Sequence, residues 1–466
     1  IEKENFLARL SNQILDKGTC TLLRKGMKYK HLHLDLYMPI PSVYNEKAKE
    51  MYTKNIFSVT RQLAYTEEVS KKALDMVVFI NGLPIITVEL KNSYTHQNYL
   101  NAIQQYREDR SSNELLFRFK KCFAHFAVCD SEVWMCTKLD DKNSRFLPFN
   151  KGDNGGAGNP VNPNGIKTDY FWKDILTKEM LSVITERFVQ IVVEVDSKTK
   201  SKKQKQIFPR YHQLYLVMHL LQDTKRDGVG KRYLIQHSAG SGKSNSIAWL
   251  AHQLTELRDS DDKKIFDSVL VVTDRVNLDK QIKNTIKQFM EVSSTVGWAK
   301  DSKTLSELLE GGKSVIITIV HKFRFILDTI NTDLKDKNFA IIIDEAHSSQ
   351  NGSLASKMNI VLSGNDVESD DIEDKIIALI NGKKMANNAS YYAFTATPKN
   401  KTLELFGKPL VDENGNPLLN EDGTKRFEAH YLYTMKQAIE EGYILDVLKN
   451  YTTYSSFYKL IKTVED

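Results

Sequence analysis

The residues best suited to chemistry lie in the segment "HSAGSGKSNS", His237 to Ser246, where an apolar run gives way to small residues. Glycines let backbone N–H groups converge on an anion, and the N-terminus of a following helix adds a favourable dipole. The pattern predicts a phosphate-binding loop, in which Lys243 reaches the β and γ phosphates of a nucleotide and the Ser244 hydroxyl ligates Mg²⁺. The residues expected to contact the nucleotide are Gly240, Ser241, Gly242, Lys243 and Ser244.

One position departs from the strict G-x-x-x-x-G-K-[ST] pattern, because His237 stands where the first glycine is expected. An ordinary glycine-rich turn is therefore the alternative. The later segment "FAIIIDEAHSSQ" favours the nucleotide site, since its isoleucines predict a buried strand with Asp344 and Glu345 at the carboxyl end, where open α/β sheets bind ligands. Asp344 would hold Mg²⁺ through water, and Glu345 would orient and deprotonate an attacking water. The alternative for this acidic pair is a helix cap.

A second group of reactive side chains lies near the front of the chain, in "KALDMVVFINGLPIITVELKN". Glu89 and Lys91 project to the same face of a strand, and Asp75 lies on the preceding apolar strand. Two carboxylates and a lysine on an apolar sheet are costly to bury unless they bind a cation or each other. The segment resembles the PD-(D/E)xK nuclease core, and the resemblance implies that Asp75 and Glu89, helped by the carbonyl of Leu90, hold Mg²⁺. The alternative is a surface salt bridge on a hairpin.

Such a metal would polarise a scissile phosphate and lower the pKa of a bound water, while Lys91 would orient that water or offset transition-state charge. The geometry depends on the register of the two strands. A two-residue turn at 81–82 would place Asp75 opposite Val88 and point Glu89 to the other face. A three-residue loop at 81–83 would place Asp75 directly opposite Glu89. The metal site therefore requires the longer loop or a bulge.

Two patterns of secondary structure position these residues. Residues 1 to about 150 mix helical stretches with apolar strands. From about residue 206, short β-branched runs alternate with helical stretches, which is typical of a parallel sheet covered on both faces. The predicted fold class is α/β, with a mixed α/β domain followed by a doubly wound domain that carries the phosphate loop.

Several segments of the second domain resemble motifs of superfamily 2 helicases and translocases: "DEAH", "FTATP" and "TDRVNLDKQ". The resemblance implies that ATP is the nucleotide and that the domain has a RecA-like fold. It also implies that Thr395 and Thr397 couple the nucleotide state to DNA contact, and that Arg275 and Thr318 touch DNA phosphates. An arginine that follows a strand is also common as a plain surface residue.

The segment "IFPRYHQLYLV" resembles the adenine-reading motif of the same superfamily. The resemblance implies that Gln213 hydrogen-bonds the adenine edge and that Phe208 or Arg210 packs on the ring. The alternative is an ordinary amphipathic helix.

The front of the chain resembles the PD-(D/E)xK nuclease core, with Leu74 where that core has proline. Both halves in this order resemble the restriction (R) subunit of type I restriction-modification enzymes. One departure concerns the next helix, where that family often has Gln-x-x-x-Tyr. Tyr106 is present, but Ala102 occupies the glutamine position, so Gln104 and Gln105 are the available substitutes.

The resemblance implies an ATP-driven double-stranded DNA translocase fused to a Mg²⁺-dependent endonuclease that cleaves unmethylated DNA away from its recognition site. Methyltransferase and specificity subunits would be its partners, and S-adenosylmethionine would enter only through the methyltransferase. A stand-alone DNA repair helicase-nuclease and a non-enzymatic DNA-binding scaffold are the alternatives.

The chain is expected to be a fragment truncated at its N- and C-terminal ends. Such a fragment should bind ATP but hydrolyse it poorly. The expected domains are a nuclease domain with a connecting helix (1–196), a lysine-rich linker (197–207), a RecA-like first lobe (208–435) and the start of a second lobe (436–466).

Composition supports a cytoplasmic protein. The 466 residues are 41% hydrophobic and carry a formal net charge of +6, which permits nucleic acid as a partner without requiring it. No apolar run reaches the roughly 18 residues that a membrane span needs. Cys122, Cys129 and Cys136 lack metal-ligand spacing, so buried thiols in a reducing compartment are expected rather than a metal cluster.

Overall fold

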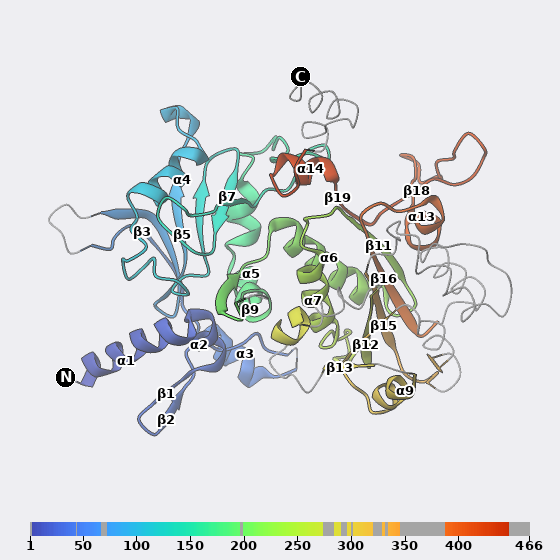
Figure 1. The fold of residues 1–466 in the computed structure, drawn as a ribbon, viewed down its shortest axis with the longest axis horizontal. Coiled ribbons are helices and arrows are strands. Elements are labelled where there is room, and N and C mark those ends of the chain that lie inside the picture. Colours follow the sequence, from blue (N-terminus) through green and yellow to red (C-terminus); the bar gives the residue numbers. More distant parts are fainter. Residues whose placement is uncertain are drawn as a thin grey trace, which may run out of the picture.

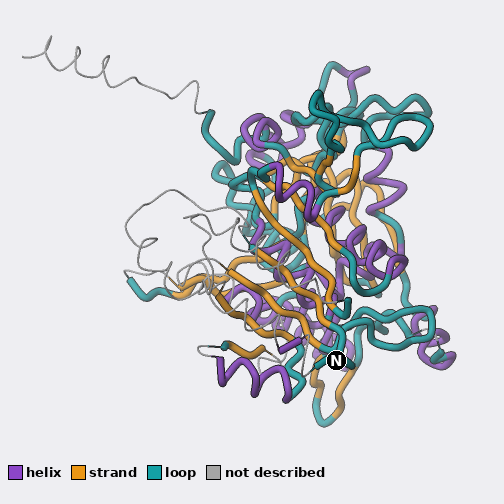
Figure 2. The backbone as a smooth tube through the Cα atoms, turned by 90° about the vertical axis from the view of Figure 1, so that its right-hand side faces the viewer, coloured by secondary structure: helices purple, strands orange, loops and turns teal. Residues whose placement is uncertain are grey.

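The computed structural model contains two α/β domains that lie side by side, one drawn from blue to cyan and the other from green to red (Figure 1). The described residues are 2–42, 44–66, 72–195, 199–273, 284–289, 296–299, 302–319, 329–330, 334–344 and 387–446. In the turned view, strands run through the interior of the molecule and helices lie around them (Figure 2). The α/β fold class predicted from the sequence is confirmed.

The first domain is built on a mixed sheet with the strand order β3-β4-β5-β6-β7-β8. β5 and β6 are parallel, and the other neighbours are antiparallel. The strands are β3 (Phe57–Ala64), β4 (Ala73–Ile80), β5 (Leu83–Leu90), β6 (Ala124–Val128), β7 (Val133–Cys136) and β8 (Leu147–Pro148). β5 is central, and helices α2 and α4 both contact it.

Helices and short elements surround this sheet. They are α1 (Glu2–Lys17), α2 (Thr19–Lys25), the hairpin β1 (Met27–Tyr29) and β2 (Leu32–Leu34), α3 (Glu46–Thr53), the 3₁₀ turn Ser93–Thr95 and α4 (Tyr99–Glu108). Helix α5 (Lys178–Val183) is flanked by the π-helical turns Phe171–Ile175 and Ile184–Phe188. Even-numbered β5 residues such as Val88 share a core with α2, whereas Ala102 and Tyr106 of α4 belong to a separate core on the other face.

A β-bulge sets the register of β4 and β5. The turn has two residues, because Ile80 pairs with Leu83, but the register shifts between Val78 and Phe79. Beyond the shift Met76 pairs with Val88, so the next pair outward brings Asp75 opposite Glu89. The bulge that the metal-site hypothesis allowed is therefore present, and the three-residue loop is not.

The lysine-rich segment expected as a linker is instead largely a strand. β10 (Lys202–Ile207) pairs antiparallel with β9 (Gln190–Val195). Its lysines are exposed, but Gln206 is buried and donates hydrogen bonds from Nε2 to the carbonyls of Cys122 (2.7 Å) and Phe123 (2.8 Å). Most of the strand is exposed, as a charged segment suggests, and only Gln206 is buried within it.

The second domain is built on a parallel sheet with the order β13-β14-β12-β15-β16-β11-β19. Its strands are β11 (Arg232–His237), β12 (Ser268–Thr273), β13 (Val296–Trp298), β14 (Val315–Ile319), β15 (Phe339–Ile343), β16 (Ala389–Thr395) and β19 (Tyr431–Tyr433). A small antiparallel pair, β17 (Lys408–Pro409) and β18 (Phe427–Glu428), lies outside it.

Helices cover both faces of this sheet, as predicted for a doubly wound, RecA-like domain. They are α6 (Tyr211–Asp227), α7 (Lys243–Leu254), α9 (Ser302–Glu310), α13 (Asn400–Phe406) and α14 (Met435–Glu440). Residues of α6 and α7 share a core with one set of alternate strand residues, and residues of α9 and α13 share a core with the other set.

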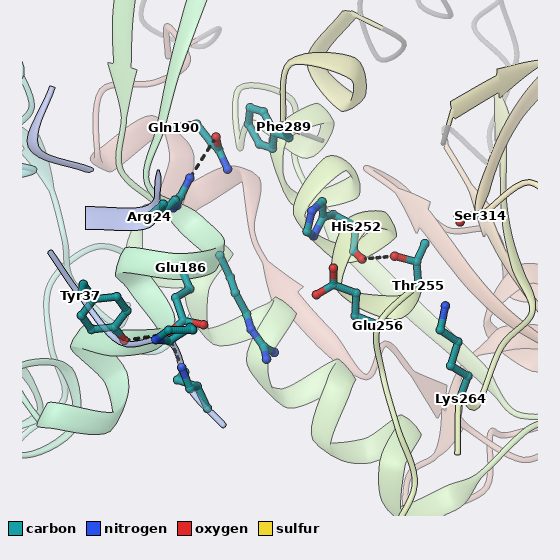
Figure 3. A pocket seen from close by; sticks show the side chains of 13 residues that line it. Arg24, Tyr37, Glu186, Gln190, His252, Thr255, Glu256, Lys264, Phe289 and Ser314 are labelled. Atoms are coloured by element: carbon teal, nitrogen blue, oxygen red, sulfur yellow. Dashed lines mark hydrogen bonds between the residues drawn. The ribbon is translucent and has the colours of Figure 1, made fainter. Parts of the chain in front are cut away.

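The two domains share one core. Phe208 packs edge-on against Phe126 and Phe149 of the first domain, and Trp249 of α7 donates a hydrogen bond to the carbonyl of Phe188 (2.9 Å). A cavity of about 530 Å³ also lies at the junction, lined by Arg24, Tyr37 and Glu186 from one side and by His252 and Lys264 from the other (Figure 3). None of the residues predicted to do chemistry lines this cavity.

The buried thiols expected from the sequence are present. All four cysteines are free thiols and buried. No helix within the described ranges has the length and hydropathy of a membrane span.

The buried Gln206 contacts give a test of the strand assignment. Gln206→Leu removes the donor to two carbonyls, so we expect a loss of about 1–3 kcal/mol in the free energy of unfolding. Lys203→Gln, at an exposed position of the same strand, should stay within about 0.5 kcal/mol of the wild type. Urea titrations followed by circular dichroism measure both; equal stabilities of the two variants would contradict the assignment.

Candidate nuclease and nucleotide sites

The candidate nuclease site lies on one face of β5, where alternate residues meet the end of α4 (Figure 1). Strand periodicity puts Thr87, Glu89 and Lys91 on this face. Thr87 contacts Tyr106, and Lys91 contacts Gln105. The helix thus supplies a partner at each end of the strand segment.

Asp75 is held from two sides. Its Oδ2 accepts a hydrogen bond from the backbone N–H of Leu90 (2.8 Å), and its Oδ1 accepts one from Nε2 of Gln62 (2.9 Å). The contact with Leu90 crosses from β4 to β5 and depends on the bulge register. The structure therefore brings Asp75 to Glu89, as predicted, and adds Gln62, which has a positive φ of 50° within β3.

Glu89 is fully buried and forms an ion pair with Arg110. Nε of Arg110 donates to Oε1 at 2.6 Å, whereas Oε2 is buried with no hydrogen-bond partner among the described residues. Burial raises the pKa of Glu89 to about 7; Arg110 acts against this shift, and the nearby Asp75 carboxylate adds to it. The carboxylate is thus costly to keep charged here unless a further cation balances it.

Lys91 shows which glutamine supports the site. Its Nζ donates a hydrogen bond to Oε1 of Gln105 at 2.7 Å, whereas Gln104 bonds Glu108 on the exposed side of α4. Ala102 lies on the buried face of α4 and is itself fully buried. Of the two substitutes proposed from the sequence, Gln105 is therefore the one in contact with the site.

The donor set fits a divalent cation. Two carboxylates from neighbouring strands converge, and one buried oxygen of Glu89 has no partner within the part of the chain that the structure describes. Oxygen ligands are those that Mg²⁺ prefers. A cluster of three or more His, Cys, Asp or Glu side chains is absent from the described residues, so backbone carbonyls or water would have to complete the coordination.

The predicted phosphate loop connects β11 to α7. Gly240 and Gly242 both have positive φ (74° and 78°), and Gly242 precedes the first residue of the helix. Lys243 lies half-buried at the helix start, with Nζ 3.5 Å from the carbonyl of His237. His237, which stands at the position of the expected first glycine, is the last residue of β11 and is buried. This burial lowers the pKa of His237 to about 3.

Gln213 lies against this loop. Its Nε2 donates to the carbonyls of Gly242 (3.1 Å) and Ser241 (3.3 Å), and its Oε1 accepts from the backbone N–H of Arg210 (3.0 Å). A Cβ at Gly242 would lie 2.6 Å from that Nε2, a contact that the flexible Gln213 side chain could relieve, so the requirement for glycine comes from the positive φ.

Phe208 and Arg210, the two residues expected to pack on the adenine ring, both line one cavity but have different surroundings. Phe208 is buried in the aromatic junction between the domains, whereas the Arg210 guanidinium lies 3.6 Å from the ring centre of Tyr443 and donates to the carbonyl of Gly240 (2.8 Å). A cavity of about 500 Å³ adjoins these residues and is also lined by Gln213 and Asn245.

The other predicted motor residues follow the carboxyl edge of the parallel sheet. Asp344 is buried directly after β15 and Thr318 is buried in β14. Thr395 ends β16, which lies between β15 and β11, and the exposed Thr397 follows it. Two other predicted residues, Glu345 and Arg275, lie outside the described residues.

Arg110, Gln62 and Tyr443 were missed by the sequence analysis. Arg110 follows α4 at the end of the polar run "QQYREDR", a pattern that reads as a solvated helix end. The signal that could have found it is the need of a buried carboxylate for a counter-ion.

Comparisons with known proteins give the family. The SWI2/SNF2 ATPase family matches residues 212–459, and the family of type I restriction enzyme R protein N termini matches residues 7–144. The chain is an HsdR-type subunit with a SWI2/SNF2 ATPase domain. The RecA-like sheet and the mixed sheet of the HsdR-type chain correspond to these two matches.

Among curated relatives, the HsdR-type chain is 23% identical to the type I restriction enzyme SsaAORF53P endonuclease subunit of Staphylococcus saprophyticus, over 83% of this chain and 37% of that protein. It is 26% identical to the HindI endonuclease subunit of Haemophilus influenzae, over 65% of this chain and 28% of that protein. The chain thus spans about a third of the length of the relatives it matches. A solved fragment described as an HsdR subunit from Vibrio vulnificus shares 15% identity over 76% of this chain and 54% of that chain, with a TM-score of 0.28.

A buried histidine beneath the nuclease site predicts acid sensitivity. Thr87 Oγ1 lies 2.7 Å from Nδ1 of His125, and burial lowers the pKa of His125 to about 3. The folded state therefore disfavours the protonated ring, so this contribution to stability is complete above the unfolded pKa of about 6.5 and is lost as the pH falls toward 3.

We expect His125→Asn to reduce the loss of stability on acidification. Between pH 7.5 and 5.5, the free energy of unfolding should fall less in the variant than in the wild type, by roughly 1.4 kcal/mol at pH 5.5. Asn substitution of the exposed His31 is the control for the loss of a histidine as such. Identical pH profiles for His125→Asn and wild type would contradict this account.

Proposed function

We propose that this chain combines an ATP-dependent double-stranded DNA translocase with a Mg²⁺-dependent endonuclease. The observation that carries the endonuclease is the β-bulge that sets Asp75 opposite Glu89, with Lys91 on the face of Glu89. The phosphate loop between β11 and α7, with Asp344 on the same edge of the sheet, supports the motor. The proposed nuclease domain is 1–196, and the proposed motor lobe is 208–435, with 436–466 beginning a second lobe.

In the nuclease, Asp75 and Glu89 would hold Mg²⁺, which when bound polarises the scissile phosphate and acidifies water. The backbone N–H of Leu90 and the Gln62 amide orient the Asp75 carboxylate. Gln105 orients the Lys91 ammonium, which offsets negative charge at the phosphate. The catalytic residues of this proposal are Asp75, Glu89 and Lys91.

In the motor, the amides at Gly240, Ser241 and Gly242 and the Lys243 ammonium would bind the ATP phosphates. Ser244 and Asp344 would hold its Mg²⁺, and Glu345 would activate the attacking water. Gln213 would read the adenine. The DNA contacts proposed for Arg275 and Thr318, and the coupling role proposed for Thr395 and Thr397, rest on the motif resemblance.

We further propose that the chain acts in a type I restriction-modification complex and cleaves unmethylated DNA away from the recognition site. The curated relatives are named endonuclease subunits of type I restriction enzymes, which supports this assignment. Methyltransferase and specificity subunits are the proposed partners, S-adenosylmethionine would be bound by the methyltransferase, and the cytoplasm is the proposed location.

Cleavage by the assembled complex tests both halves of the proposal. The full-length subunit is purified from its host at low salt, and plasmid cleavage and ATP hydrolysis are measured. We expect Asp75→Asn to abolish cleavage and keep ATP hydrolysis, and Lys243→Ala to abolish both. Cleavage by the Asp75→Asn complex would refute the nuclease site. Absence of methyltransferase and specificity subunits from the purified material would favour a stand-alone helicase-nuclease.

Nucleotide binding by this chain tests the phosphate loop alone. Lys243→Ala should weaken ATP binding at least about tenfold in calorimetric titrations, because the ammonium contacts two phosphates. Lys231→Ala, an exposed lysine just before β11, should leave the affinity unchanged. Equal affinities in the two variants would show that ATP binds elsewhere or not at all.

A further inference from the structure

Arg110 is the buried partner of the proposed metal ligand Glu89. It is 5% exposed and lies just beyond the end of α4, from which it reaches β5. Arginine–carboxylate pairs are frequently bidentate, with two parallel hydrogen bonds. Here only Nε contacts Glu89, at Oε1.

Other groups occupy the rest of the guanidinium. Nη2 donates to the carbonyl of Ala73 (2.9 Å), and Nη1 donates to the hydroxyl of Tyr65 (3.1 Å). The Tyr65 ring also lies 5.5 Å from the guanidinium carbon. The structure gives Arg110 a single hydrogen bond to Glu89, and Oε2 of Glu89 has no hydrogen-bond partner among the described residues.

We propose that Arg110 is a positioning residue that holds Glu89 by one oxygen and leaves the other for a divalent cation shared with Asp75. The inference rests on the proposed nuclease function and extends it. Ala73 is two residues before Asp75 on β4, so the same guanidinium connects both metal-binding strands. Arg110 touches neither the substrate nor the metal in this scheme.

A purely structural role predicts a different outcome from a positioning role. Removing a structural ion pair would lower stability but leave the metal affinity of the folded protein unchanged. Removing a positioning residue lets the Glu89 carboxylate rotate, so metal affinity falls; partners of metal ligands typically cost roughly 10–100-fold in affinity when replaced.

Direct Mn²⁺ binding to the whole chain separates these roles. Free Mn²⁺ is followed by electron paramagnetic resonance, without nucleotide and in a Lys243→Ala background, so that the motor site does not contribute. We expect Arg110→Met to bind Mn²⁺ roughly 10–100-fold more weakly than its parent, and Arg110→Lys to recover part of the loss. In the assembled enzyme, the Arg110→Met variant should need correspondingly more Mg²⁺ for cleavage and approach the wild-type rate at saturation.

Arg107 provides the matched control. It lies on the last turn of α4, and its guanidinium donates to the carbonyl of Ser144 rather than to Glu89. Arg107→Met removes the same type of side chain and should keep the parental Mn²⁺ affinity. If Arg110→Met does not fold, Tyr65→Phe, which removes only the hydroxyl on Nη1, should show a smaller loss of affinity in the same direction.

The outcomes are distinguishable. Parental Mn²⁺ affinity in a folded Arg110→Met variant, or in both Arg110→Lys and Tyr65→Phe, overturns the positioning role and leaves the nuclease proposal intact. Mn²⁺ binding that survives Asp75→Asn and Glu89→Gln overturns the metal site itself. Loss of Mn²⁺ binding in Asp75→Asn and Glu89→Gln supports the metal site. A loss of affinity that increases from Arg110→Lys to Arg110→Met supports the positioning role.

Discussion

A fully buried carboxylate is the constraint around which the first domain is arranged. An uncompensated charge at Glu89 would be strongly destabilising, because water cannot reach it and the surrounding strand is apolar. Arg110 compensates one oxygen only. The strand register brings Asp75 to this side chain, and Arg110, just past α4, places a cation against it.

Helix α4 is the element that meets this need. Gln105 contacts Lys91, Tyr106 contacts Thr87, and Arg110, just past the helix, contacts Glu89. Three side chains on the same face of the strand therefore each have a partner within residues 105–110. Side chains on one face of a strand recur every two residues, whereas those on one face of a helix recur every 3.6 residues. The pairs 105–91, 106–87 and 110–89 therefore form together only while the helix keeps its position. We infer that displacing α4 would disturb all three contacts together.

The predictable parts of this molecule are those with a local signal. Apolar runs predicted the parallel strands, and the glycine spacing predicted the turn between β11 and α7. The required pairing of Asp75 with Glu89 predicted either a three-residue loop or a bulge, and the structure has the bulge. Arg110, the strand Lys202–Ile207 and the burial of Phe208 could not be predicted in this way. Each depends on a partner far away in the sequence, and single-residue propensities contain no information about which distant residue will be opposite.

The shared core limits how the two domains can move. Phe126, Phe149 and Phe208 interlock at the junction, and close-packed aromatic interiors do not deform continuously. The contact between Arg210 and Tyr443 is different, because it pairs one guanidinium with one ring beside a cavity that could admit a base. Nucleotide binding is therefore expected to rearrange the segment around Tyr443 before it rearranges the junction. The nuclease sheet would then stay fixed to the phosphate-loop domain while the segment around Tyr443 moves.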